Sequence, residues 1–382
     1  MPLPCPVAPR RSLPRGLFTL AVVGGIATFL SAAPLHAARW HVNCETGKDT
    51  ASGREDAPFA TIQKAIKTAR DGDVIELHPK GAVFRQSATF SNRSNLTIEG
   101  NGVTLDGADP LPADGWEEVE PGLARRRLPR TALDRHLLII EGRMERMGRT
   151  QSANSPTFPA VADLKPGQFC FENDGEKSGW LYVRGSKKNL EWATRVNGIA
   201  TGGTCRNLVV RNLNTRNFLN DGFNIHGDCR EQRFEAITGY DCFDEGFSAH
   251  ETSECQIDGG RFYGNENGVA DVNSSETIYR NCEFTGNVNF EVLFAGAAHQ
   301  LIDCRIVNTT AVTALSAGPR AKDAAFDLKL IRVAIDAPDR EKPGRARVSG
   351  GTLTVEEGTL GNMNFDSTGT RSPEKTADPG RS

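Results

Sequence analysis

The sequence is poor in aromatic residues, in net charge and in long hydrophobic runs. Aromatic residues make up 7% of its 382 residues, and the formal net charge at pH 7 is −3. The N-terminal apolar run, residues 17–30, is shorter than the roughly 20 residues that a membrane-spanning helix needs. With 38% hydrophobic and 24% charged residues, the composition excludes a membrane bundle, a collagen and a disordered chain. We therefore expect a folded, water-soluble protein.

Two further absences limit the chemistry. No Cys-x-x-Cys pair occurs, so the sequence does not support a zinc ribbon. No lysine lies between Lys188 and Lys322, and a lysine from that segment is therefore excluded as a catalytic base. A histidine or an arginine would have to take that role.

The first 37 residues have a composition of their own. Three arginines precede the apolar run, and small residues follow it through Ala37. This order predicts a secretory signal over residues 1–37, with a retained membrane anchor as the alternative. We expect cleavage, no stable membrane insertion afterwards, and a secreted or periplasmic monomer. Loss of the three arginines brings the net charge to −6, which argues against nucleic acid as a partner.

Eight cysteines remain after the signal, an even number that suits an oxidising compartment. They are Cys44, Cys170, Cys205, Cys229, Cys242, Cys255, Cys282 and Cys304. Cys205 and Cys229 lie 24 residues apart, and Cys282 and Cys304 lie 22 apart. Each pair could form a disulfide or could be two buried thiols, and the sequence leaves both open.

Residues 53–106 predict a helix followed by short strands. Ile62, Ala65, Ile66 and Ala69 recur at the spacing of an amphipathic helix. Strands are expected over residues 74–77, 96–98 and 103–105, separated by Gly, Asn and Asp turns. A helix ahead of short strands is typical of a β-solenoid whose first open layer is capped.

The strongest pattern is an internal repeat between residues 205 and 307. The segment Gly-Phe-Asn-Ile-His at residues 222–226 recurs 24 residues later as Gly-Phe-Ser-Ala-His. Repeats of this length are typical of solenoids, in which each turn of the chain stacks on the previous one. We expect the apolar residues to stack inward. A ladder of turn residues is expected at Asn217, Asp241, Asn265 and Asn287.

These patterns lead to a resemblance. The segment Phe-Ala-Thr-Ile-Gln-Lys-Ala-Ile at residues 59–66, followed by Gly-Asp-Val-Ile, resembles the start of carbohydrate-active enzymes of the pectate-lyase-like superfamily. The resemblance implies an all-β fold, a right-handed parallel β-helix with an N-terminal cap helix. The cap and first coils would cover residues 38–108, and further coils residues 198–360. Because this superfamily includes lyases, epimerases, hydrolases and non-catalytic proteins, the fold alone does not choose among them.

Residues 109–197 break the repeat and predict a small inserted β-subdomain. Strand-like runs are expected at 137–140, 167–171 and 180–183, with a hairpin turn at 141–143. Eight arginines between residues 125 and 149 could bind an anionic sugar or form a solvated basic face. The polar segment 361–382 predicts a disordered tail.

Acids and histidines gather at one rim of the predicted coils. Because strand residues alternate, His226 and His250 should point outward from neighbouring coils, about 4.8 Å apart along the backbone. Between residues 221 and 303, sixteen acids accompany four arginines, a net charge of −12. Such a surface would repel a polyuronate unless a cation such as Ca²⁺ lies between the two. We assign catalytic roles to His250, His226, Asp244 and Glu245, substrate binding to Asn220, Asn224, Ser248, Glu251 and Arg261, and Ca²⁺ binding to Asp221, Asp241, Asp244 and Glu245.

A second resemblance concerns one histidine. The segment Gly-Phe-Ser-Ala-His-Glu at residues 246–251 is similar to the Gly-Phe-Asp-Pro-His-Asp signature of the alginate C5-epimerase family. The resemblance implies that His250 abstracts the proton next to a uronate carboxylate, a task that suits the pKa of histidine. Ser248 stands where the family has Asp, and Ser274 and Ser275 stand where its arginine is expected. These departures favour lyase-like chemistry over epimerisation.

Three functions are thus open from the sequence. The first is proton abstraction on a uronate-containing polysaccharide, as in a lyase or an epimerase. The second is a glycoside hydrolase in which Asp221 works with Asp244 or Glu245, at a separation of about 5 to 9 Å. The third is a non-catalytic, glycan-binding or structural β-helix. A cluster of two histidines and an acid could also hold a transition metal.

Overall fold

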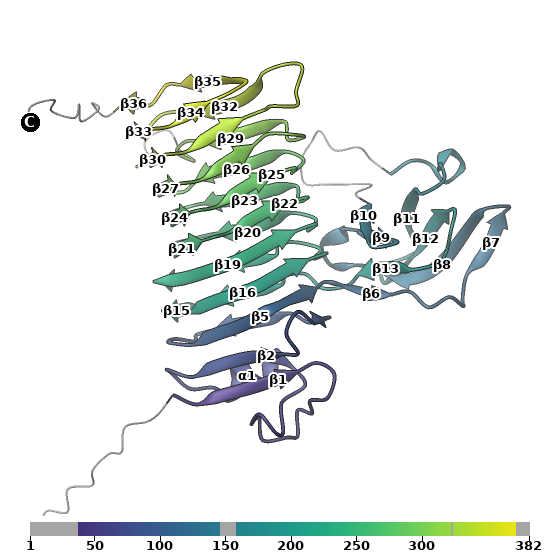
Figure 1. The fold of residues 1–382 in the computed structure, drawn as a ribbon. Coiled ribbons are helices and arrows are strands. Elements are labelled where there is room, and N and C mark those ends of the chain that lie inside the picture. The colour runs from purple at the N-terminus through teal and green to yellow at the C-terminus, as the bar shows by residue number, and fades with distance from the viewer. Residues whose placement is uncertain (1–36, 146–157, 322–323, 372–382) are drawn as a thin grey trace, which may run out of the picture. The chain divides into compact units, whose positions relative to one another are not determined.

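The computed structural model describes residues 37–145, 158–321 and 324–371 (Figure 1). Apart from Ala37, the predicted signal over residues 1–37 lies outside the described residues. None of the helices in the described ranges has the length and hydrophobicity required to cross a membrane.

Successive turns of the chain stack in parallel to form two long sheets (Figure 1). Each strand pairs with the strand one turn later, as β16 does with β19 and β17 with β20. Within the described residues, one sheet has 17 strands, the other has nine, and two short strands form a third sheet. This arrangement confirms the predicted all-β parallel β-helix.

The 17-stranded sheet contains β1 (Arg39–Asn43), β2 (Val74–His78), β3 (Val83–Phe84), β5 (Thr97–Asp106), β16 (Val209–Arg216), β19 (Gln232–Tyr240), β21 (Glu254–Asp258), β22 (Arg261–Tyr263), β24 (Glu276–Arg280), β25 (Glu283–Thr285), β27 (Ala298–Ile302), β28 (Arg305–Val307), β30 (Asp327–Ile331), β31 (Ala334–Asp336), β33 (Thr352–Glu356), β34 (Thr359–Leu360) and β36 (Thr370–Arg371). The nine-stranded sheet contains β4 (Ala88–Ser91), β14 (Ile199–Gly202), β17 (Phe223–Ile225), β20 (Glu245–Ala249), β23 (Asn267–Val272), β26 (Phe290–Ala295), β29 (Thr313–Ala317), β32 (Gly344–Val348) and β35 (Met363–Ser367). The short pair is β15 (Thr204–Arg206) with β18 (Asp228–Arg230).

The predicted cap helix is α1 (Ile62–Thr68). It begins at Thr61, whose hydroxyl accepts a hydrogen bond from the Lys64 amide at 3.2 Å, and its apolar face is buried. The strands predicted at residues 96–98 and 103–105 are one strand, β5. The turn expected between them is a local bend at Asn101, which has a positive φ of 53°. On both sides of this bend, β5 pairs with β16.

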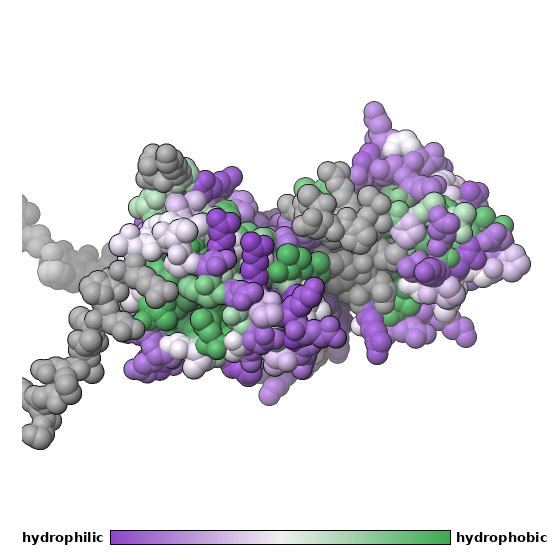
Figure 2. Space-filling view, turned by 90° about the horizontal axis from the view of Figure 1, so that it is seen from above, coloured by the Kyte–Doolittle hydropathy of each residue, from purple (hydrophilic) through white to green (hydrophobic). Residues whose placement is uncertain are grey.

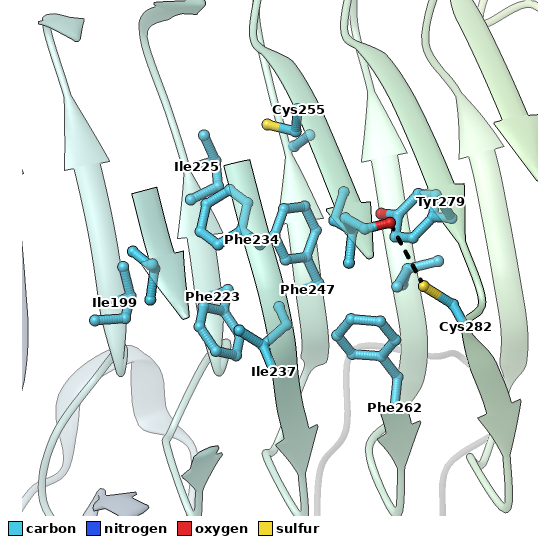
Figure 3. Close-up of a cluster of buried hydrophobic side chains, with 14 of the residues drawn as sticks. Ile199, Phe223, Ile225, Phe234, Ile237, Phe247, Cys255, Phe262, Tyr279 and Cys282 are labelled. Carbon is cyan, nitrogen blue, oxygen red and sulfur yellow. Dashed lines mark hydrogen bonds between the residues drawn. The ribbon is translucent and has the colours of Figure 1, made fainter. Parts of the chain in front are cut away.

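The interior of the coils is built from aligned apolar side chains (Figure 3). Phe223 and Phe247 occupy equivalent positions of β17 and β20, and Phe234 packs edge-on against Phe247 with ring centres 5.0 Å apart. Ile225 and Ala249 are also fully buried, which confirms the predicted inward positions. Each buried phenylalanine stabilises the stack by roughly 1.5–3 kcal/mol.

The predicted turn ladder forms only in part. Because Tyr240 pairs with Tyr263, Asp241 lies opposite Gly264, one position out of line with Asn265 and Asn287. Asn287 accepts hydrogen bonds through Oδ1 from the backbone and the side chain of Asn265, at 3.0 and 3.2 Å. The described cysteines are thiols. Cys205 and Cys229 lie side by side in register, so the sulfurs stack between coils without a covalent bond.

The break in the repeat is occupied by two antiparallel sheets. The first contains β6 (Ala108–Pro110), β9 (Leu138–Ile140), β10 (Arg143–Glu145) and β13 (Leu190–Ala193), and the second contains β7 (Glu117–Glu120), β8 (Leu123–Pro129), β11 (Phe169–Asn173) and β12 (Ser178–Arg184). Two short 3-10 helices, η1 (Ala132–Asp134) and η2 (Val161–Asp163), accompany them. The first and last residues of the insertion meet, since Ala108 pairs with Ala193 and the Thr194 amide donates to the Gly107 carbonyl at 2.9 Å.

The coils extend further toward the C-terminus than the sequence indicates. Strands β35 and β36 pair with β32 and β33, so residues 363–371 belong to the last coil and not to a disordered tail. Residues 372–382 of the predicted tail lie outside the described residues. Figure 2, viewed from above Figure 1, shows hydrophobic surface among polar groups, and Val355 and Leu360 of the final strands are 41% and 53% exposed.

Candidate active site

Three carboxyl groups meet where the chain enters β17 and β20. Asp221 lies in the turn before β17, while Asp244 and Glu245 lie at the start of β20, one coil later. The parallel register joins the two coils through a hydrogen bond from the Gly222 amide to the Glu245 carbonyl, 2.9 Å long. One oxygen from each of the three carboxyls lies within 4.8 Å of the other two. The repeat therefore places acids that are 24 residues apart beside one another.

The carboxylate of Asp221 accepts three hydrogen bonds. Its Oδ2 accepts hydrogen bonds from Asn224 Nδ2 at 2.5 Å and Ser248 Oγ at 2.7 Å, and its Oδ1 accepts one from the Glu245 amide at 3.2 Å. Asp221 is 1% exposed, so these donors replace water around the carboxylate. Asn224 and Ser248 point away from the core, as expected, but they are buried because they bind this acid.

Asp244 is a buried acid with a guanidinium partner. Burial, with the nearby charge of Asp221, raises the pKa of Asp244 to about 7. The positive charge of Arg135 acts in the opposite direction, since its Nη2 lies 3.0 Å from Asp244 Oδ2. Arg135 follows η1 in the insertion and also donates to the side chain of Asn220. The insertion thus supplies a positive charge to a site whose acids belong to the coils.

Glu245 favours its protonated form. Burial, and next the charges of Asp244 and Asp221, raise its pKa well above the usual value. Asn267, from the following strand, donates to Glu245 Oε1 at 2.7 Å and fixes the side chain. A carboxyl that favours its proton therefore lies beside Asp221.

The two predicted histidines stack at the edge of this group. The rings of His226 and His250 lie 3.9 Å apart with an angle of 13° between their planes. Glu251 lies 3.1 Å from His226 Nδ1 and accepts a hydrogen bond from the Gly227 amide at 2.9 Å. Burial, and next the charge of His226, lower the pKa of His250, so that its imidazole is neutral at pH 7.

The acids and histidines line one pocket of roughly 290 Å³. Ala270, Val272 and Leu293 from β23 and β26 form its apolar wall. This volume lies near the lower end of the range of about 300–1,000 Å³ that small-molecule sites have. A floor of polar groups and an apolar wall suit a sugar ring, which has a polar edge and an apolar face.

Two residues that the sequence assigns to the site lie elsewhere. Asp241 ends β19 in a left-handed turn beside Gly264, where an added Cβ would lie 2.2 Å from its Oδ1. Arg261 belongs to β22, pairs with Glu283 at 3.3 Å and has a side chain that is 63% exposed. Both belong to the 17-stranded sheet, whereas β17 and β20 belong to the nine-stranded sheet. The assignments of Asp241 and Arg261 are therefore not supported by position.

Two groups of the site were not identified from the sequence. Arg135 is one of the eight arginines in the basic run, and nothing in that run distinguishes it from the others. Asn267 falls at the same repeat step as Glu245 and pairs with it in the sheet register. The repeat spacing alone would have pointed to Asn267, but no local signal would have pointed to Arg135.

Comparisons with known proteins support the fold. No known family and no curated protein matches the sequence. Among solved structures, the chain is similar to a complex of XylC with xylose, with a TM-score of 0.52, 13% identity, and 86% of this chain and 69% of that chain covered. A protein described as a glycoside hydrolase gives a TM-score of 0.56, 11% identity, and coverage of 88% and 95%. These likenesses show the fold, a parallel β-helix.

Proposed function

We propose that this protein is a glycoside hydrolase that cleaves a polysaccharide or an oligosaccharide derived from one. The observation that carries the proposal is the contact of two carboxyls in different surroundings. Asp221 accepts hydrogen bonds from Asn224 and Ser248, while burial and neighbouring charges raise the pKa of Glu245 well above its usual value. An acid and a nucleophile that differ in this way are what hydrolysis of a glycosidic bond requires.

The spacing favours the retaining stereochemistry. The three carboxyls have oxygens within 4.8 Å of one another. Retaining enzymes hold their two carboxyls about 5–5.5 Å apart, whereas inverting enzymes separate them by about 6.5–9.5 Å to admit a water molecule. We therefore expect a product whose anomeric configuration is that of the substrate.

The steps follow from these positions. Glu245 donates its proton to the glycosidic oxygen while Asp221 attacks the anomeric carbon, so the leaving sugar departs as an alcohol and a glycosyl ester forms on Asp221. Water then attacks the anomeric carbon and displaces the Asp221 carboxylate, while Glu245, now ionised, takes a proton from that water and returns to its first state. Asp244 is a positioning residue, because its charge contributes to the raised pKa of Glu245.

The first experiment measures reducing ends and ultraviolet absorbance together on a panel of acidic and neutral polysaccharides. Hydrolysis releases reducing ends alone. Asp221→Asn and Glu245→Gln should each lower turnover by at least about 100-fold, because each removes a group that acts on the reacting bond. Glu235→Gln is the matched control, since Glu235 lies on β19 with a side chain that is 47% exposed. Full activity in Asp221→Asn would overturn the proposal.

Proton abstraction from a uronate by His250 is the second candidate. Its support is the lowered pKa of His250, which leaves a neutral base in the pocket, together with Arg320, whose charge acts on that imidazole. Elimination would produce an unsaturated sugar that absorbs in the ultraviolet. A rise in absorbance that is lost in His250→Ala would favour this candidate over hydrolysis.

A requirement for Ca²⁺ would distinguish hydrolysis of a neutral sugar from elimination on a uronate. Asp221, Asp244 and Glu245 offer the carboxylate oxygens that this ion prefers, so these residues would hold it. A bound Ca²⁺ would neutralise a uronate carboxylate. Hydrolysis of a neutral sugar by the steps above needs no such charge, so we expect turnover to be unchanged by EGTA if the first candidate is right.

A further inference from the structure

A second cluster of metal-ligating side chains lies in the first two coils, on strands β1 and β2. His41 on β1 lies beside Glu76 on β2 in the parallel register, and His78 follows Glu76 by two residues on the same face. His41 Nδ1 and His78 Nε2 are 3.3 Å apart. Glu76 Oε2 lies 3.6 Å from the first nitrogen and 3.8 Å from the second. None of these residues takes part in the candidate active site.

These distances are those expected around a small divalent ion. Zn²⁺ binds imidazole nitrogen and carboxylate oxygen at about 2.0–2.2 Å, which separates two tetrahedral ligands by about 3.4 Å. The three measured separations lie close to that value, and a point exists about 2.1 Å from all three atoms. The ligands are therefore already spaced for an ion that touches each of them.

The rings of His41 and His78 are oriented so that their nearest nitrogens face each other. The ring centres of His41 and His78 are 5.4 Å apart while their nearest nitrogens are 3.3 Å apart, so the rings meet edge to edge through those nitrogens. In the pair His226 and His250 the rings lie face to face at 3.9 Å, and their in-plane lone pairs run parallel. The first pair converges on one point, and the second does not.

Only one carboxylate oxygen of Glu76 faces the two histidines. Arg39 pairs with its Oε1 and leaves Oε2 directed at the two histidines. The side chains of His41, Glu76 and His78 are 12%, 18% and 37% exposed, so an ion can enter from the side of His78. Three protein ligands leave a fourth tetrahedral position for water.

We propose that His41, Glu76 and His78 form a binding site for a divalent transition metal, with Zn²⁺ as the ion to test. Two imidazoles and one carboxylate select Zn²⁺ or its neighbours over Ca²⁺, which prefers oxygen ligands alone. The bound ion ties β1, the first strand of the stack, to β2. It therefore stabilises the N-terminal end of the coils, where no earlier described strand covers β1.

The test is a Zn²⁺ titration by calorimetry on the mature protein made without a polyhistidine tag. We expect one ion per chain, a higher thermal midpoint with Zn²⁺, and at least about a tenfold loss of affinity in His41→Gln, His78→Gln and Glu76→Gln. Glu99→Gln is the matched control. Glu99 is the register partner of Glu76 on β5 but binds Arg211 and Asn212 instead.

A second measurement needs no variant. Co²⁺ replaces Zn²⁺ with the same geometry, and tetrahedral nitrogen and oxygen ligation gives intense visible absorption bands that octahedral ligation does not. Such bands, removed by equimolar Zn²⁺, would support the site. Absence of Zn²⁺ binding would overturn the proposal. Binding that survives in His41→Gln and His78→Gln but is lost in His226→Gln would also overturn it.

Discussion

At the scale of single residues, the candidate active site consists of three neighbouring acids, Asp221, Asp244 and Glu245, which have different hydrogen-bond and charge partners. Asp221 accepts three hydrogen bonds, Asp244 faces Arg135, and Glu245 is held by Asn267. Like charges this close cannot all ionise at neutral pH, so the pKa of at least one carboxyl must rise. Burial, and next the charges of Asp244 and Asp221, raise the pKa of Glu245 well above its usual value, so Glu245 is the acid that keeps its proton.

Replacement of Arg135 by glutamine should change the pH profile of turnover. Without the guanidinium, the pKa of Asp244 rises above about 7 and this residue becomes neutral. A neutral Asp244 no longer raises the pKa of Glu245, so Glu245 loses its proton at a lower pH. The alkaline limb of kcat/KM should therefore move toward lower pH, and turnover at pH 8 should fall more than at pH 5.

The control for this prediction is Arg127→Gln. Arg127 lies on β8 of the same insertion and pairs with the exposed Asp174 at 3.1 Å, away from the three acids. Its replacement should leave the pH profile where it is. An alkaline limb that stays in place in Arg135→Gln would show that Arg135 does not set the protonation of the site.

At the scale of elements, the sequence allowed good prediction wherever the chain repeats. The 24-residue step between the two Gly-Phe segments correctly indicates that β17 and β20 pair in register, because parallel stacking converts a sequence interval into a neighbour. It also correctly predicts the stack of His226 on His250. A repeat does not specify which sheet lies next to a given turn, and for that reason the sequence does not show that Arg261 lies on β22 and that Asp241 directly follows β19.

Contacts outside the repeat could not be predicted. Arg135 reaches Asp244 across 109 positions of sequence, and the contact exists because the insertion packs on the turns of the coils. Leu137 and Ile139 of the insertion share a buried cluster with Leu219 and Phe243 of those turns. Packing of this kind depends on the shapes of both surfaces, and no period in the sequence records it.

Phe247→Ala should destabilise the coils strongly. Phe247 on β20 is fully buried and contacts the rings of Phe223, Phe234 and Tyr279. Its loss leaves a cavity between coils, which typically costs about 3–5 kcal/mol in the free energy of unfolding. Urea unfolding followed by circular dichroism measures this.

The comparison variant is Val119→Ala, on β7 of the insertion, where the side chain is 48% exposed. A change within about 0.5 kcal/mol is expected there. An equal effect of the two substitutions would contradict the assignment of Phe247 to the core of the stack.

At the scale of the whole molecule, the insertion leaves the coils and returns to them at one point. Ala108 and Ala193 pair directly, and β5 pairs with β16 on both sides of the bend, with a register shift between Arg211 and Leu213. In a solenoid each coil is stabilised mainly by its neighbours. The coil stack should therefore fold without the insertion.

Deletion of residues 109–192 tests this directly. An Asn-Gly dipeptide between Ala108 and Ala193 closes a two-residue hairpin on strands that already pair. We expect a folded β-rich protein with a cooperative melt, and turnover with the pH profile of Arg135→Gln, because Arg135 is gone while the carboxyls remain. Loss of the β signal in circular dichroism would show that the coils need the insertion to fold.

The meeting of Ala108 with Ala193 has a consequence for how this protein can change. The carboxyls that would break the bond belong to the coils, whereas the guanidinium beside Asp244 belongs to a segment that leaves and rejoins the coils at one antiparallel pair. Recombination at Ala108 and Ala193 exchanges the insertion and keeps the coils. The insertion can thus be exchanged, in the laboratory or in evolution, while the three carboxyls of the coils stay in place.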